Sequence, residues 1–486
     1  MWPAYPSHVR MMEGVSHAVW SRLSALRGSV GPLVRLATPV IAAELGWMSM
    51  GIVDTLMVSP LGPAALGAVG IGSMLFIAVG IFGMGLLLGL DTVVSQAYGA
   101  GDPRACKEWL VAGLWLAGLA CLPLAAVLGV MVVSLGHLGL HPDVAPLVGD
   151  YLVIVSFSLP PLLFYAAVRR YLQGMSWVGP VAFALVSANV INIAVNWVLI
   201  EGRLGFPALG VVGAAWATVI SRSYLFVVLA LVSRWVWVLQ RGRLAPSRRA
   251  APDSPSARWT HVPWRRVHRL TALGVPAAAH LLFEVGIFTA ATALAGRLEP
   301  ASLAAHHIAL NIASVVFMVP LGISSAGAVL VGHGLGQRDG AAAARAGWTA
   351  LLVVVAVMAA SAFTIWMRPA LWVGLFTDDT TVIAIGGRLL LVAAAFQLFD
   401  GLQVTATGVL RGLGETRLPM VASLIGYWGV GLPLGYWLCF HAGYGVFGLW
   451  MGLAASLFVV GNALVWLWRV RVRQTVSALH LRAVPA

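Results

Sequence analysis

Charged residues are scarce in this chain. Lys, Arg, Asp and Glu make up only 10% of its 486 residues, whereas hydrophobic residues make up 60%. The mean hydropathy is +0.90. Because a soluble domain needs a charged surface, and about 25% of its residues are charged, this composition excludes an ordinary soluble protein. It predicts an integral membrane protein.

Cysteine is also rare, and its spacing indicates neither a metal site nor a disulfide framework. Cys106, Cys121 and Cys439 form no CxxC and no Cys/His pattern. The GxxxxGK[ST] sequence that binds the phosphates of ATP is absent from the chain. We therefore expect no cofactor and no ATP hydrolysis by this motif, so that the energy for any transport comes from an ion gradient or from a partner.

Lysine is almost missing, since Lys107 is the only one, and the net charge of +13 comes from arginine. The arginines are scattered between apolar runs, which argues against nucleic acid as a partner. Cytoplasmic loops accumulate Lys and Arg. The loops on one side of the predicted spans hold most of the arginines, and those on the other side hold only Arg203, Arg297 and Arg368. This bias predicts a protein of the inner (plasma) membrane with both termini in the cytoplasm.

What the chain has in abundance is apolar runs long enough to cross a bilayer, which takes about 20 residues each. Twelve can be counted between Leu33 and Trp468, and their continuity favours helices over the alternating strands of a membrane barrel. The predicted fold is all-α, with twelve transmembrane helices in two six-helix lobes. The predicted organisation is a cytoplasmic leader at 1–32, an N-terminal lobe at 33–239, a cytoplasmic linker rich in Arg, Pro and Ser at 240–268, a C-terminal lobe at 269–470 and a cytoplasmic tail at 471–486.

The two predicted lobes are related by an internal repeat. LGPAALGAVGI at 61–71 aligns with LEPASLAAHHI at 298–308, and the same ungapped register pairs Pro39 with Pro276 and Gly85 with Gly322. Because six spans separate the copies, they run parallel and are related by a pseudo-two-fold axis along the membrane normal. In transporters with this symmetry the substrate site lies between the repeats.

Carboxylates inside the spans indicate where function resides, because a charge at the bilayer centre costs about 2.5 to 3.5 kcal/mol on insertion scales. Glu284 and Asp400 both lie near the middle of predicted spans in the C-terminal lobe. We interpret them as an ion or cation site at a water-filled cavity. The alternative is a pair of protonated carboxyls hydrogen-bonded to neighbouring helices.

Three further acids lie in the first two spans. Asp54 is toward the outer end of its span, so it is either a site of its own in the N-terminal lobe or an acid that reaches the interface. The repeat aligns Glu284 with Trp47, so Asp54 is not its copy. Glu44, ten residues before Asp54, is a candidate for the same cavity. For Asp91, near the cytoplasmic end of the second span, a structural or gating role is favoured over ion binding.

Amides form a second polar feature. Asn189, Asn192 and Asn196 follow one another at three- and four-residue steps, and so share one face of the predicted span at 181–200. On a helix face exposed to lipid, three amides would have no hydrogen-bond partners. They indicate either a cavity or hydrogen bonds that hold two helices together.

The polar residues lie within longer segments of distinctive sequence. These are ATPVIAAELGWMSMGIVDTLM, GLDTVVSQAYGAGD, HLLFEVGIF, AAHHIALNIASVVFMVPLGISSAG with VGHGLGQRD, and FQLFDGLQVTATGVLRGLGETRLP. Together they resemble the multidrug and toxic compound extrusion (MATE) family, most closely its NorM-type branch. The resemblance extends from about Leu33 to Trp468. It implies a V-shaped pair of lobes that exports drugs, chiefly organic cations, in exchange for H⁺ or Na⁺.

The resemblance also implies roles for single residues. Asp54, Glu284 and Asp400 match the family's coupling and cation-binding acids, with the latter two facing the C-lobe cavity and holding Na⁺ if that is the coupling ion. Gln403 of the same motif is a further cavity candidate. Phe396 departs from relatives that often have tyrosine there, and this departure counts against Na⁺ more than against H⁺. Drugs and the bilayer are the expected partners of a monomer that is not an enzyme.

Two other functions compete with drug export. A flippase for lipid-linked oligosaccharides or other lipids would line its cavity with several arginines facing a pyrophosphate, and only Arg222 and Arg388 lie within the predicted spans. A membrane enzyme acting on lipid would gather its acids and histidines at one interface beside a large loop. Glu284 and Asp400 lie instead at mid-depth, and the loops are short.

Overall fold

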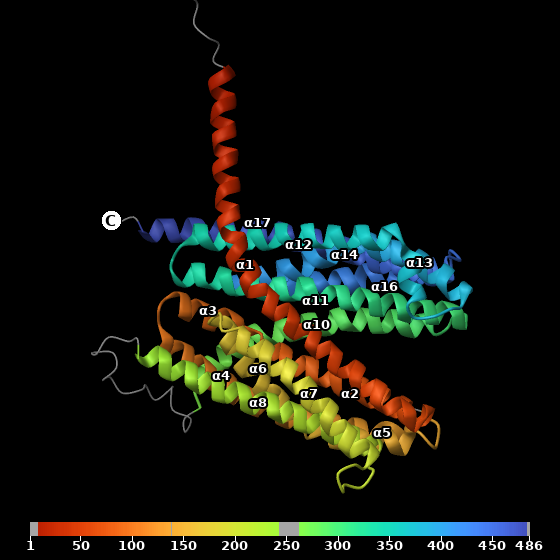
Figure 1. The fold of residues 1–486 in the computed structure, drawn as a ribbon. Coiled ribbons are helices and arrows are strands. Elements are labelled where there is room, and N and C mark those ends of the chain that lie inside the picture. Colours follow the sequence, from red (N-terminus) through yellow and green to blue (C-terminus); the bar gives the residue numbers. More distant parts are fainter. Residues whose placement is uncertain (1–7, 138, 243–261, 484–486) are drawn as a thin grey trace, which may run out of the picture.

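The computed structural model describes residues 8–137, 139–242 and 262–483, and every regular element in these ranges is helical (Figure 1). The first half contains α1 (His8–Val58), α2 (Pro63–Leu86), α3 (Gly89–Gly99), α4 (Pro103–Ser134), α5 (Ala145–Ser156), α6 (Leu159–Gly174), α7 (Gly179–Glu201) and α8 (Val211–Gly242). The second half contains α10 (Trp264–Ala295), α11 (Pro300–Gly336), α12 (Gly340–Met367), α13 (Pro369–Gly374), α14 (Thr380–Leu413), α15 (Arg417–Ser423), a π-helical segment at Leu424–Gly431, α16 (Leu432–Phe440) and α17 (Gly445–Ala483).

The expected number of membrane spans is confirmed within the described ranges. Eleven helical segments there are long and apolar enough to cross a bilayer, and there are twelve when the pair α5 and α6, bent by 45°, is counted as one broken span. The helix α1 continues from the first span back to His8, so the predicted leader at 1–32 is helical from that residue. Of the predicted linker at 240–268, residues 243–261 lie outside the described part of the chain.

The repeat in the sequence reappears in how the helices begin. Proline is the first residue of α2 and of α11, at two positions that the repeat pairs, where its missing N–H costs nothing. Asp102 caps α4 by accepting from the backbone N–H groups of Arg104 and Ala105. Its repeat partner Asp339 caps α12 in the same way, by accepting from Ala342 N at 2.8 Å. Equivalent residues therefore start equivalent helices.

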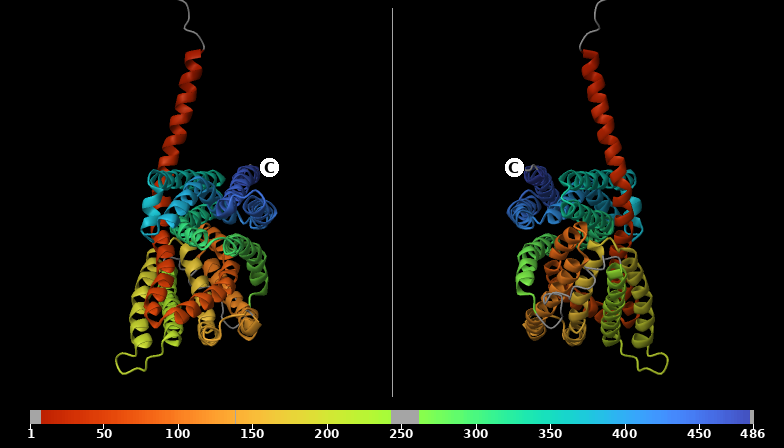
Figure 2. Two further views of the ribbon diagram at one scale, coloured as in Figure 1. Left: turned by 90° about the vertical axis from the view of Figure 1, so that its right-hand side faces the viewer. Right: turned by 90° about the vertical axis from the view of Figure 1, so that its left-hand side faces the viewer.

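Contacts between the lobes follow the register of the internal repeat. Gly85 on α2 packs against the backbone of Ala278 on α10, and Gly322 on α11 packs against Ile41 on α1. The repeat pairs Gly85 with Gly322 and Ile41 with Ala278. The first helix of each lobe therefore packs on the second helix of the other, as a two-fold axis between the lobes requires. Figure 2 shows α1 and α10 at opposite edges of the junction.

Each lobe has its own apolar core, and α1 belongs to both. Ala43, Met50 and Val58 lie in the core of the N-terminal lobe, whereas Leu33 and Leu36 lie in that of the C-terminal lobe. Figure 1 shows the lobes close together at the end where the C-terminus lies and further apart at the other end. The arrangement is a V, and its closed end is built from α3 and α11.

Candidate functional site

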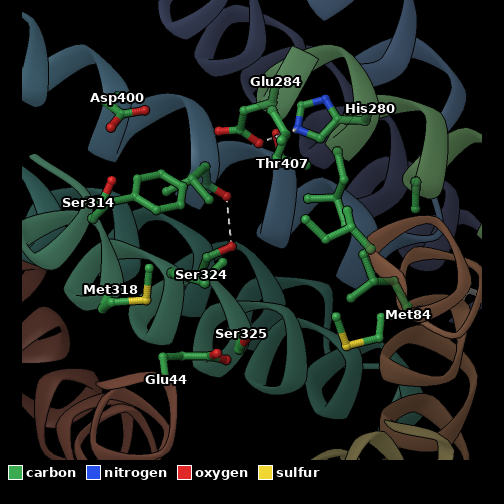
Figure 3. Close-up of a pocket in the computed structure, with 18 of the residues that line it drawn as sticks. Glu44, Met84, His280, Glu284, Ser314, Met318, Ser324, Ser325, Asp400 and Thr407 are labelled. Carbon is green, nitrogen blue, oxygen red and sulfur yellow. Dashed lines mark hydrogen bonds and ion pairs between the residues drawn. The ribbon is translucent and has the colours of Figure 1, made fainter. Parts of the chain in front are cut away.

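A cavity of about 530 Å³ lies between the lobes and is walled mainly by apolar side chains. On the N-terminal side the walls come from α1, α2 and α6, and on the C-terminal side from α10, α11, α14 and α15. Figure 3 shows Glu284 and Asp400 on one side of this space and Glu44 on the other. The volume is within the range of small-molecule sites.

One face of α14 runs along the cavity. Phe396, Asp400, Val404, Thr407 and Arg411 all line it, and their spacing of three or four residues places them in a single stripe. The stripe begins with an aromatic ring, continues with an acid and ends three turns later with a guanidinium. The cavity therefore has an acidic end and a basic end.

Glu284 on α10 and Asp400 on α14 form the acidic end. The Gln403 amide, Nε2, donates to Glu284 Oε1 at 2.5 Å, and His280 Nε2 lies 3.8 Å from Glu284 Oε2. Ser423 and His280 Nδ1 share a hydrogen bond of 2.8 Å, which orients the ring. The two carboxyl groups are close enough to interact electrostatically. The structure thus brings together three residues that the sequence named, Glu284, Asp400 and Gln403.

Two oxygens at this end have no donor among the residues that the structure describes. They are Asp400 Oδ1 and Gln403 Oε1, and both are buried. A buried acceptor without a partner costs free energy of about 1 to 3 kcal/mol. Two oxygens without donors, next to the carboxylate of Glu284, favour the binding of a proton or a cation.

Two aromatic residues lie beside the acids. Phe396 lines the cavity and packs against Trp450, with ring centroids 5.6 Å apart. Tyr427, from the π-helical segment, was not anticipated from the sequence. Its buried hydroxyl has no hydrogen-bond partner among the described residues and lies within electrostatic range of Glu284 and Asp400. A phenol is therefore present near the acids although position 396 lacks one, and no motif in its apolar run marks it.

Asp54 lies elsewhere, inside the N-terminal lobe. Asn196 Nδ2 donates to Asp54 Oδ1 at 2.7 Å, and the Thr218 hydroxyl donates to Asp54 Oδ2 at 3.3 Å. Asn196 also donates to Asn192 Oδ1 at 3.1 Å. The acid is buried, and so it does not extend to the membrane interface. The third amide, Asn189, donates to the backbone oxygen of Gly46 and holds α7 against α1.

Glu44 lines the cavity between the lobes and pairs with Arg169 on α6. Asp54 is not among the residues that line this cavity. Ten residues of α-helix rise about 15 Å and leave two side chains about 80° apart around the axis. The structure therefore separates Glu44 from Asp54, and Glu44, a candidate for the same cavity as Asp54, lines the cavity between the lobes without it.

Asp91 lies at the closed end, between the lobes. Its Oδ2 is 3.3 Å from Arg170 Nη1 on α6 and 3.4 Å from Arg411 Nε on α14. The neighbouring Thr92 hydroxyl donates to the backbone oxygen of Arg411 at 2.5 Å, and Gln96 Nε2 donates to that of Gly412 at 3.1 Å. These contacts join the N-terminal lobe to α14.

Three arginines that follow the predicted apolar runs line the cavity. They are Arg169, Arg170 and Arg411. The statement that only Arg222 and Arg388 lie within spans is wrong, because α6 and α14 continue past their apolar runs to Gly174 and Leu413. The apolar runs end before the helices do, because these helix ends are buried between the lobes and carry polar side chains there. The one available signal was the Arg169 and Arg170 pair directly after an apolar run.

The chain matches a known family model twice. The MatE model matches residues 39–198 and again residues 276–437. The two matches begin at Pro39 and Pro276, which are paired by the internal repeat.

Curated relatives match over nearly the whole chain. A probable multidrug resistance protein NorM of Mesorhizobium japonicum is 36% identical over 465 residues, which is 93% of this chain and 97% of the relative. The multidrug resistance protein NorM of Burkholderia vietnamiensis is 34% identical over 96% of this chain and 100% of its own length.

Solved structures share the fold at low sequence identity. The eukaryotic MATE transporter AtDTX14 superposes with a TM-score of 0.81 at 21% identity, over 94% of this chain and 100% of that one. An outward-facing multidrug resistance MATE transporter superposes with a TM-score of 0.77 at 19% identity, over 93% and 98%.

Proposed function

The chain belongs to the MatE family, and from this premise we propose that it is a secondary antiporter, which exports organic cations and amphipathic drugs in exchange for inward-moving H⁺ or Na⁺. Its relatives are named as multidrug resistance proteins, and this chain is a multi-pass membrane transporter and not an enzyme. The observation that carries the proposal is the acidic end of the cavity. There Glu284 and Asp400 face a space of about 530 Å³, and Asp400 Oδ1 and Gln403 Oε1 have no hydrogen-bond partner among the residues that the structure describes.

Exchange follows from competition for these carboxylates. An organic cation is held when at least one carboxylate is charged, because an uncompensated charge inside the membrane is costly. A proton neutralises that charge, and a Na⁺ ion held by Asp400, Glu284 and the Gln403 carbonyl offsets it. Either ion therefore weakens the binding of the drug, and by linkage the drug weakens the binding of the ion to the same degree.

The available energy sets a limit on export. A membrane potential of 100 mV supplies about 2.3 kcal/mol per charge, and a tenfold ion gradient supplies about 1.4 kcal/mol. When one monovalent drug cation leaves for one entering proton, the charges cancel and only the chemical part remains. A neutral drug would gain both contributions.

We assign the described conformation to the outward-facing state. The lobes are packed together at the end that carries the C-terminus, and the arginine distribution predicts that this end is cytoplasmic. We further propose that the chain works as a monomer in the inner membrane.

Asp54 supplies a second proton site under this proposal. It is buried inside the N-terminal lobe with Asn196 and Thr218 as donors. Protonation would remove the charge that orders these donors, and so would change how α1, α7 and α8 pack. The N-terminal lobe would then respond to protons without contacting the drug.

The cavity arginines leave a lipid-linked oligosaccharide flippase as the competing function. A pyrophosphate would be attracted to Arg170 and Arg411 but repelled by Glu284 and Asp400 in the same cavity. The acidic end thus favours a cationic or zwitterionic substrate over a pyrophosphate.

Drug efflux from proteoliposomes under an imposed pH or Na⁺ gradient tests the proposal. Glu284→Gln and Asp400→Asn should lose gradient-driven export, since neither amide can exchange a proton. Glu299→Gln is the matched control, because Glu299 is exposed at the start of α11. Export by both cavity variants at the wild-type rate under either gradient would refute coupling at these residues, and the gradient that drives the wild type identifies the ion.

A further inference from the structure

The basic end of the cavity carries one more positive charge than negative charge among the described residues. Arg169 is balanced by Glu44, and the lining residue Glu415 is balanced by Arg471 at 3.1 Å. The remaining two arginines, at positions 170 and 411, have a single carboxylate, Asp91, between them.

The sharing of Asp91 leaves Arg411 Nε without a hydrogen bond among the described residues. Arg170 and Arg411 approach the same atom, Asp91 Oδ2, through one nitrogen each, and Arg170 Nη1 also donates to Gln173 Oε1 at 3.4 Å. A guanidinium has five N–H donors in a planar fork that fits a carboxylate or phosphate. Arg411 is only 8% exposed, so water satisfies little of this capacity.

We propose that Arg170 and Arg411 form an anion subsite, which binds the carboxylate of zwitterionic substrates whose amine is held by Glu284 and Asp400. The proposal rests on the proposed function, because it concerns the same cavity and extends its substrate class. Monocations would use the acidic end alone, and zwitterions would use both ends.

The geometry of α14 fits such a ligand. Asp400 and Arg411 are eleven residues apart on one face of the helix, which is a rise of about 16 Å and an offset of about 20° around the axis. Side chains on a helix lean toward its N-terminus, so that of Arg411 leans toward Asp400. Val404 lies between them and, with Phe317 and Met318 of α11, offers an apolar wall for the body of the substrate.

The competing explanation is that the two arginines only lock the lobes together through Asp91. If the arginines only hold the lobes together, replacing them should change the binding of every substrate alike, because the conformation of the whole cavity changes. An anion subsite affects only ligands that carry the anion. Two ligands that differ by that group alone therefore separate the explanations.

Rhodamine 110 and rhodamine 123 are such a pair, since the second is the methyl ester of the first. Binding of each dye to the purified full chain is measured by fluorescence anisotropy, with thermal unfolding to confirm that each variant is folded. Arg411→Gln and Arg170→Gln should weaken rhodamine 110 at least about tenfold and change rhodamine 123 by less than about twofold. Arg411→Lys, which keeps the charge, should retain most of the affinity for rhodamine 110. Arg388→Gln, exposed on the same helix, is the matched control.

The outcomes distinguish the inference from the proposed function. Equal weakening of both dyes by the arginine variants, or no weakening of either, would overturn the anion subsite. If Glu284→Gln and Asp400→Asn still weaken rhodamine 123 in that case, the proposed function stands without the subsite. If wild-type protein binds neither dye, or binds rhodamine 123 independently of both acids, the two proposals fail together.

Discussion

Gly336 on α11 packs directly against the backbone oxygen of Gln96 on α3, with no room between them for a side chain. The repeat produces the reciprocal contact, in which Gly99 packs against the backbone of His333. The close packing at the closed end of the V therefore depends on two glycines at equivalent positions. Each lies against backbone atoms, which move less easily than a side chain to make room for a Cβ.

Gly336→Ala should force α3 and α11 apart. Overpacking of this kind costs about 1 to 3 kcal/mol, so we expect a lower midpoint of thermal unfolding in detergent. Gly67→Ala is the control, because a Cβ at Gly67 would meet no atom within 4 Å. An unchanged midpoint for Gly336→Ala would show that the helices at this end separate without cost.

Gln403→Leu should impair gradient-driven export. The amide donates to Glu284 Oε1 at 2.5 Å, and a hydrogen bond to a charged group contributes about 1.5 to 3 kcal/mol. We expect export from proteoliposomes to fall roughly tenfold or more. Gln397→Leu is the matched control, since Gln397 is buried on the same helix but bonds to Met358 outside the cavity. Equal effects of the two variants would argue for a general packing defect.

Asp54→Asn should reduce transport without unfolding the protein. The amide keeps the shape of the side chain but cannot be titrated, so the link between protons and the N-terminal lobe is lost. Typical coupling free energies of about 1 to 3 kcal/mol correspond to about 5- to 150-fold, and we expect the rate of export to fall within that range. Glu201→Gln, at the exposed end of α7, serves for comparison. Transport at the wild-type rate would assign Asp54 a purely structural role.

Asp91→Asn should destabilise the chain, because it leaves Arg170 and Arg411 without a counter-charge in a buried place. Loss of one partner from a buried ion pair costs about 3 to 5 kcal/mol. Adding Arg411→Gln to Asp91→Asn removes one of the two stranded charges, and should restore part of the lost thermal stability. Additive losses in the double variant would contradict the charge balance inferred for this end.

The pattern along the chain was enough to predict the fold. Twelve apolar runs require helices in a bilayer, because backbone groups in lipid must be satisfied within each segment. An ungapped repeat predicts two parallel lobes, and the reciprocal contacts of Gly85 and Gly322 agree with it. Glu284 and Asp400 could be named from sequence because an acid in an apolar run is costly wherever the run packs.

Tertiary structure decided which polar residues share a site. Asp54 and Glu44 lie on one helix, yet the first bonds to Asn196 inside the N-terminal lobe and the second pairs with Arg169 at the cavity wall. The arginines at 169, 170 and 411 are the clearest case. A hydropathy profile places an arginine-rich helix end outside the membrane. It contains no information about a second lobe that covers that end. Only the tertiary structure places these arginines at the cavity, because the residues that line it come from two lobes and are far apart in the sequence.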